Sequence, residues 1–159
     1  MNRPDELISA IVEEDRLLLS RLEQCPDAFL EMRGSGGLLS FKDTLGHLAF
    51  WDSFAVRFFT RKLDSTVEND SPPLNFEQRN RQELQRVRQL SFTEVMKLYG
   101  KATRDLITFL NSRWHELSEK QRRDLFLPLK HRRHHRLLLE KTLGSQQDTD
   151  LLKEHEEEA

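Results

Sequence analysis

Histidine is the residue type whose positions in this sequence suggest chemistry. The chain contains six of them: His47, His115, His131, His134, His135 and His155. His131 and His135 are four residues apart, so on a helix they share one face, with Cβ atoms about 5–6 Å apart. Neutral imidazoles placed in this way can coordinate one divalent ion at about 2.0–2.1 Å. The pair therefore predicts two ligands of a metal site.

His47 is the candidate for a third ligand. It lies four residues before Trp51 on an apolar helical face, so its side chain is expected to point inward. If that helix lies beside the one carrying His131 and His135, three imidazoles meet in the core. Three protein ligands with open positions are typical of a catalytic ion. Imidazole suits zinc or nickel, and no cysteine or carboxylate competes at this spacing.

The histidines also have other interpretations. A single histidine such as His47 on an apolar face is often a packed, hydrogen-bonded core residue. The segment Lys130–Arg136 is basic throughout, so its histidines could belong to a solvated cationic face. His134 is three residues after His131, which is also a possible pairing, whereas His115 is expected to cap a helix end.

Helical periodicity defines the elements that must position these residues. Apolar residues recur every three or four positions in four segments, from about Pro4 to before Cys25, from Ser40 to about Lys62, from Ser91 to about Trp114 and from about Lys130 to Leu143. Asn75 begins a short, exposed helix between the second and third segments, and Gly144 is expected to end the last. The stretches Gly34–Gly37 and Asn69–Pro73 are expected to be loops.

This order of segments predicts the fold class. With no alternation of period two, the chain is expected to be all-α: a four-helix bundle with a long crossover between helices two and three. One domain is expected over residues 1–144, followed by an acidic, flexible tail over 145–159.

Composition narrows the class of protein further. The 159 residues are 36% apolar and 33% charged, as expected for amphipathic helices with solvated outer faces. One cysteine, no signal peptide and no apolar run of about 20 residues predict a cytoplasmic protein without a membrane span. Eight lysines and arginines between Lys120 and Lys141 precede six acids after Ser145, which indicates either nucleic-acid binding or, more simply, self-complementary charge. No nucleic-acid-binding motif accompanies the basic run, so such a partner is not expected.

Three segments resemble a known family. They are Phe41–Asp52, which contains His47-Leu48 and Trp51; Leu74-Asn75-Phe76 leading through Leu90–Glu94; and His131–Arg136. They are similar to the His-Leu-x-x-Trp segment, the asparagine-led crossover and the His-x-x-x-His-Arg motif of the DinB-like superfamily of bacterial four-helix-bundle proteins. That superfamily includes the YfiT-like thiol transferases and the ClbS-type protective proteins. The resemblance extends from about Leu7 to Leu143.

The resemblance implies both a metal site and a class of activity. Carried over to this sequence, the ligands of the metal-binding members are His47, His131 and His135. The implied activity is that of a divalent-metal-dependent transferase or hydrolase acting on a thiol or a small electrophilic metabolite, with a role in stress or detoxification. Arg136 is followed by Leu137 instead of the Gly-Gln of many thiol-transferase members, so the resemblance supports the metal site more than thiol transfer.

A ligand would enter between the helices, where aromatic side chains are expected to line a pocket. The candidates are Trp51, Phe54, Phe58 and Tyr99, although at helical spacing they could equally be core residues. Asp43 and Asp52 flank His47 and are expected on the helix surface or at its cap. The alternative to an enzyme is a ClbS-like bundle that binds and sequesters a small molecule, or a bundle that forms a homodimer for stability.

Overall fold

The computed structural model describes residues 3–31, 39–65 and 75–158, with side chains up to residue 144. The helices are α1 (Asp5–Gln24), α2 (Phe41–Asp64), α3 (Phe76–Arg88), α4 (Phe92–Arg113), α5 (Glu119–Asp124) and α6 (Leu127–Glu158), with 3-10 turns at Asp27–Phe29 and Trp114–Glu116. Within these ranges there is no strand, which confirms the all-α bundle. Gly34–Gly37 and Asn69–Pro73 lie outside the described residues.

Side-chain caps explain where these helices begin. Ser40 accepts a hydrogen bond from the backbone N–H of Asp43 at the start of α2, and Asn75 does the same for α3. Ser91 and Glu94 form a reciprocal capping box at the start of α4. Each cap satisfies backbone donors that have no partner inside the helix. The sequence signals for these helix starts are therefore confirmed.

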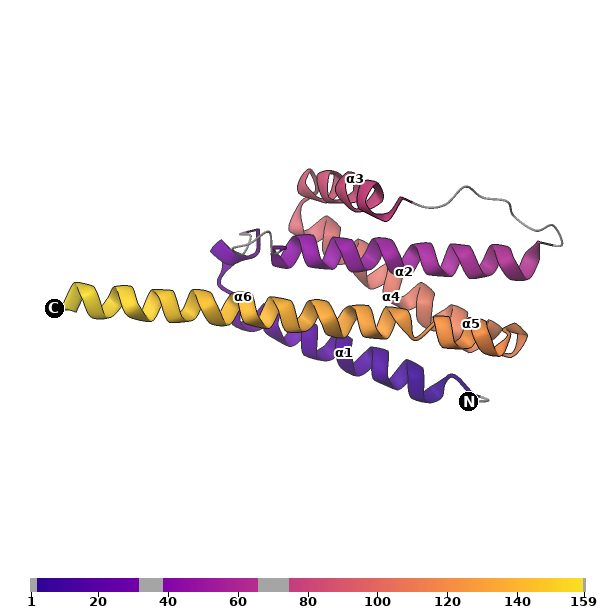
Figure 1. The fold of residues 1–159 in the computed structure, drawn as a ribbon. Helices are drawn as coiled ribbons and strands as arrows, with labels where there is room; N and C mark the ends of the chain where they lie inside the picture. The colour runs from indigo at the N-terminus through magenta and orange to yellow at the C-terminus, as the bar shows by residue number, and fades with distance from the viewer. Residues whose placement is uncertain (1–2, 32–38, 66–74, 159) are drawn as a thin grey trace.

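The long helices form two parallel pairs that run in opposite directions (Figure 1). Glu14 of α1 pairs with Arg133 of α6, and Arg21, further along α1, pairs with Glu140, further along α6, so those two helices are parallel. Asp64 at the end of α2 pairs with Arg113 at the end of α4, so these are parallel as well. The parallel arrangement of α2 and α4 is compatible with the predicted crossover, whose path includes residues 66–74 outside the described part of the chain and stays a prediction.

The helix α3 lies beside the first half of α2. The clearest contact is at Gly46, where an added Cβ would lie 2.4 Å from Cγ2 of Val87. Only a glycine allows this close approach of the two helices. The ammonium of Lys42 also lies 3.5 Å from the backbone oxygen of Arg88, which places the end of α3 next to the start of α2.

The helix α6 is longer than its sequence suggests. It begins at Leu127 and continues to Glu158, so the prediction that Gly144 ends it is wrong. Glycine costs a helix only about 1 kcal/mol relative to alanine, and it ends one only when it adopts a left-handed conformation, which Gly144 does not. Figure 1 shows the C-terminal part of α6 extending beyond the other helices. Whether this part is flexible remains a prediction.

Among the described helices, none is both long enough and apolar enough to cross a bilayer.

Candidate metal centre

Three of the six histidines come together in the structure. Nε2 of His131 lies 2.9 Å from Nε2 of His47 and 3.0 Å from Nε2 of His135. The three ring centroids are 4.6–4.7 Å apart, and one nitrogen from each ring lies within 4.8 Å of the other two. Among the described residues this is the group that could hold a metal ion.

These distances are compatible with hydrogen bonds and also with a shared ion. Two nitrogens that each lie about 2.05 Å from one ion are about 2.9 Å apart at a right angle and about 3.3 Å apart at the tetrahedral angle. The Nε2 atom of His131 faces two other nitrogens, yet a neutral imidazole nitrogen offers either one proton or one lone pair. It therefore cannot form a full hydrogen bond to both neighbours, whereas one cation can accept all three lone pairs.

Burial keeps the three imidazoles neutral. Burial is the largest cause, with a further contribution from neighbouring histidines, and together they lower the pKa of His47 and of His131 to about 4 and that of His135 to about 3. Coordination requires the neutral form. At neutral pH the three rings are therefore ready to bind an ion without losing a proton.

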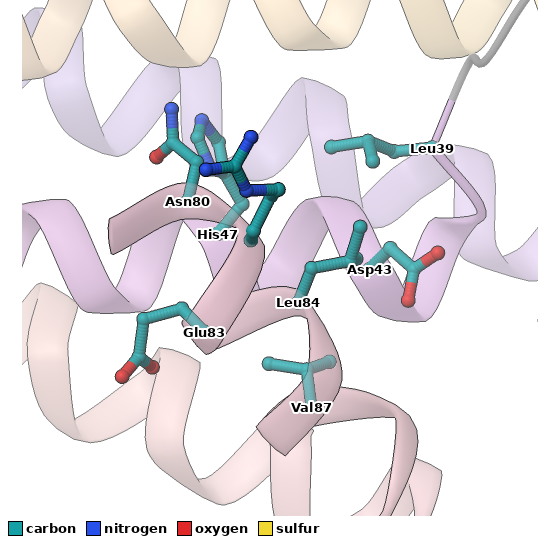
Figure 2. A pocket seen from close by; sticks show the side chains of 8 residues that line it. Leu39, Asp43, His47, Asn80, Glu83, Leu84 and Val87 are labelled. Atoms are coloured by element: carbon teal, nitrogen blue, oxygen red, sulfur yellow. The ribbon is translucent and has the colours of Figure 1, made fainter. Parts of the chain in front are cut away.

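Local packing on α2 and α3 positions His47. Because Gly46 has no side chain, Val87 of α3 packs directly on α2 one residue before the histidine. Figure 2 shows the small cavity that this packing leaves, about 220 Å³, with His47 and Asn80 at one side and Leu39 at the other. The amide oxygen of Asn80 accepts the indole N–H of Trp51 at 2.8 Å, which ties α3 to the next turn of α2.

A buried ion pair positions the other two histidines. Arg132, fully buried, lies 2.6 Å from the carboxylate of Asp52, which is 1% exposed. Burial raises the pKa of Asp52 to about 6, while the guanidinium of Arg132 acts in the opposite direction. The pair joins α6 to α2 one residue after His131 and five residues after His47. The expectation that Asp52 lies on the helix surface is therefore wrong.

The buried guanidinium of Arg132 has further partners on α4. It donates to the hydroxyl of Thr103 at 2.9 Å and lies 5.6 Å above the ring of Tyr99. The hydroxyl of Tyr99 in turn donates to Asp15 of α1. The sequence analysis did not predict this network, because the sequence of a basic run does not distinguish an arginine that is buried from one that is exposed. Its position on the same helical face as Leu139, which is 3% exposed, was the available signal.

The basic run of α6 is largely neutralised within the fold. Arg133 and Arg136 donate to the carboxylate of Glu14 on α1 at 2.9 and 2.7 Å, and Arg136 also pairs with Glu140. Glu14 is only 5% exposed, and its pKa is lowered chiefly by the hydrogen bond from Arg136. This part of the basic charge is self-complementary.

An aromatic groove of about 890 Å³ opens beside the histidines. Its apolar lining comes mainly from α2 and the first residue of α3, with Trp51, Phe54, Phe58 and Phe76 in successive ring contacts at 5.3–6.2 Å. His47 and His131 form part of its wall. An ion held by the three histidines would therefore border this groove.

The other predicted site residues, four aromatic residues and two further histidines, lie in different parts of the structure. Trp51, Phe54 and Phe58 line the groove, and their role in ligand binding stays a prediction. Tyr99 is 1% exposed in the core and does not line the groove, so its predicted place in the pocket is wrong. Its place on α4 gives it Arg132 and Asp15 as partners instead. His134 is exposed at the rim of the groove, and His115 is exposed on a 3-10 turn.

Comparison with known proteins found no match among protein families, curated proteins or solved structures.

Proposed function

We propose that this protein is a divalent-metal-dependent enzyme of the DinB-like type, with His47, His131 and His135 as the ligands. The observation that carries the proposal is the convergence of three half-buried imidazoles, each with its Nε2 atom within 3.0 Å of its nearest neighbour. The proposed reaction is group transfer or hydrolysis on a thiol or a small electrophilic metabolite, in a stress or detoxification role. The three motifs that resemble the DinB-like superfamily support this assignment.

In this proposal the histidines hold the metal ion and the groove binds the substrate. When bound, a zinc or nickel ion supplies a Lewis acid and lowers the pKa of a water or thiol bound to it. The three imidazoles hold that position with neutral ligands from α2 and α6, so open positions remain for the substrate. The aromatic side chains Trp51, Phe54 and Phe58 would give the substrate an apolar surface beside the ion.

The test is the metal content of protein purified without a histidine tag. We expect about one equivalent of zinc or nickel per chain, measured by elemental analysis after dialysis. His47→Ala should lose it, since two ligands from one turn of α6 bind far more weakly than three. His134→Ala is the matched control, because it removes a neighbouring exposed imidazole that is not in the cluster. Equal metal content in His47→Ala and the wild-type protein would refute the site.

A second candidate function is a non-catalytic, ClbS-like bundle that binds and sequesters a small molecule. The size of the groove supports it, because about 890 Å³ is typical of a small-molecule site and does not depend on a metal. Ligand binding that is unaffected by metal removal would favour this candidate. Nucleic-acid binding is weaker as a proposal, because Arg132, Arg133 and Arg136 already pair with Asp52 and Glu14.

A further inference from the structure

The groove beside the histidines has a strongly apolar lining with few free polar groups. Its walls include the rings of Trp51, Phe54, Phe58 and Phe76. Phe58 is 42% exposed and Phe76 is 59% exposed, so this aromatic surface is open to a ligand. The carboxamide oxygen of Asn80 already accepts the N–H of Trp51. A sugar or a peptide would lose hydrogen bonds to water here and regain few, which disfavours a polar ligand.

The charge around the groove is positive once an ion is bound. The three histidine ligands are neutral, so they leave the two positive charges of a divalent ion uncompensated. The two carboxylates in the lining are already paired: Asp52 with Arg132 at 2.6 Å, and Asp124 with Lys120 at 3.7 Å. Lys130 is exposed in the same lining and forms no ion pair with any residue of the described part of the chain.

The dimensions of the groove set the size of the ligand. From His47 to Phe58 the helix α2 rises about 16 Å. That length accommodates a body of two fused rings together with a short head group. A ligand of this size contacts the aromatic residues with one end and the histidines and Lys130 with the other.

From these features we infer that the groove binds a small organic monoanion with a flat apolar body, its anionic head group directed at the histidine cluster and its body lying on the aromatic residues of α2. The inference rests on the proposed metal site and specifies its ligand. It predicts that the anionic head and the apolar body make separable contributions to affinity.

The test compares three probes by isothermal titration calorimetry: naphthalene-2-carboxylate, its neutral analogue naphthalene-2-carboxamide, and acetate. With the zinc-loaded protein we expect the carboxylate to bind at least about tenfold more tightly than the carboxamide, because a charged group gains a contact to the cation. In protein stripped of metal this preference should fall to about the small contribution of Lys130. Acetate should bind at least about a hundredfold more weakly than naphthalene-2-carboxylate, because it buries little apolar area.

Variants identify the place of binding. Phe76→Ala removes an exposed ring and should weaken both naphthalene probes by about tenfold. Val12→Ala is the matched control, because Val12 is 49% exposed on α1 and does not line the groove. Lys130→Gln should weaken the carboxylate by about threefold and leave the carboxamide unchanged.

The outcomes separate this inference from the proposed function. Zinc binding without any preference for the carboxylate, or equal affinities in Phe76→Ala and the wild-type protein, would overturn the inference alone. Failure of the wild-type protein to bind zinc would overturn the metal site and the anionic part of the inference together.

Discussion

At the scale of single residues, the imidazoles of His47, His131 and His135 are distinguished from ordinary core histidines by their mutual geometry. A core histidine usually bonds to a backbone carbonyl or a carboxylate, whereas these three point their Nε2 atoms at one another. Such an arrangement brings together three ring nitrogens that could hold one metal ion. Arg132, the residue after His131, is buried and is not part of the cluster, and its carboxylate partner Asp52 comes from the helix of His47.

The ion pair between Asp52 and Arg132 should stabilise the fold and position His131. Asp52→Asn leaves a buried guanidinium without its counter-charge, which we expect to lower the free energy of unfolding by about 3 kcal/mol. Urea denaturation measures this loss. Metal affinity should also fall, because α6 is no longer fixed against α2 at the cluster.

The control for this prediction is Asp105→Asn. Asp105 pairs with Lys101 on the surface of α4, where an ion pair contributes about 0–1 kcal/mol. If Asp52→Asn lowers the free energy of unfolding by no more than Asp105→Asn does, then the buried ion pair does not stabilise the site.

At the scale of helices, the close contact of α2 and α3 at Gly46 determines where His47 lies. The two helices approach so closely that an added Cβ would overlap both γ-methyl groups of Val87, at 2.4 and 2.7 Å. The packing of α3 on α2 at this point therefore requires a glycine at position 46.

Gly46→Ala should force α3 away from α2. We expect it to cost about 1–3 kcal/mol of stability, as overpacking of a core commonly does. Adding Val87→Ala removes the overlapping methyl groups, so the double variant should lose less stability than the sum of the two single changes. Thermal denaturation of the four proteins gives this coupling. Additive losses would mean that the contact at Gly46 does not limit the packing.

The C-terminal part of α6 raises a separate question at the same scale. The predicted domain boundary implies that a chain of residues 1–144 folds by itself, because the buried residues on α6 end at Leu139 in the part with described side chains. We expect this shortened chain to keep its metal content and to melt within a few degrees of the full chain, measured by circular dichroism. Loss of the metal or a large drop in melting temperature would show that the domain includes the C-terminal residues.

At the scale of the whole molecule, buried histidines link stability to pH. In the unfolded chain the three imidazoles have a pKa of about 6.5, whereas in the folded protein the pKa values are about 4, 4 and 3. Between about pH 6.5 and pH 4 the unfolded state binds more protons, so the stability of the metal-free protein should fall as the pH falls. Asp52, whose pKa is raised, has the opposite effect in the same range, but one carboxylate opposes three imidazoles.

Urea denaturation with a chelator at pH 7.5 and pH 5 measures this dependence. The midpoint should be clearly lower at pH 5, and replacing the three clustered histidines together by glutamine should reduce the difference. A midpoint that is equal or higher at pH 5 would show that burial does not keep these imidazoles neutral. Saturating zinc at pH 7.5 should raise the melting temperature, because the ion binds only the folded cluster.

The sequence by itself determined the helix starts and the shared face of His131 and His135, since both depend on local spacing, whereas the approach of His47 to that pair depends on how α2 packs against α6. Periodicity and the caps at Ser40, Asn75 and Ser91 predicted the helix starts, and the spacing of His131 and His135 predicted that they share a face. The end of α6 was missed because a glycine in a helix is a weak signal. Only the tertiary structure decided that Tyr99 and Asp52 are buried, and that Arg132 alone among the arginines of its run enters the core. Those outcomes depend on which helices lie opposite each residue, and local spacing carries no information about partners distant in the chain.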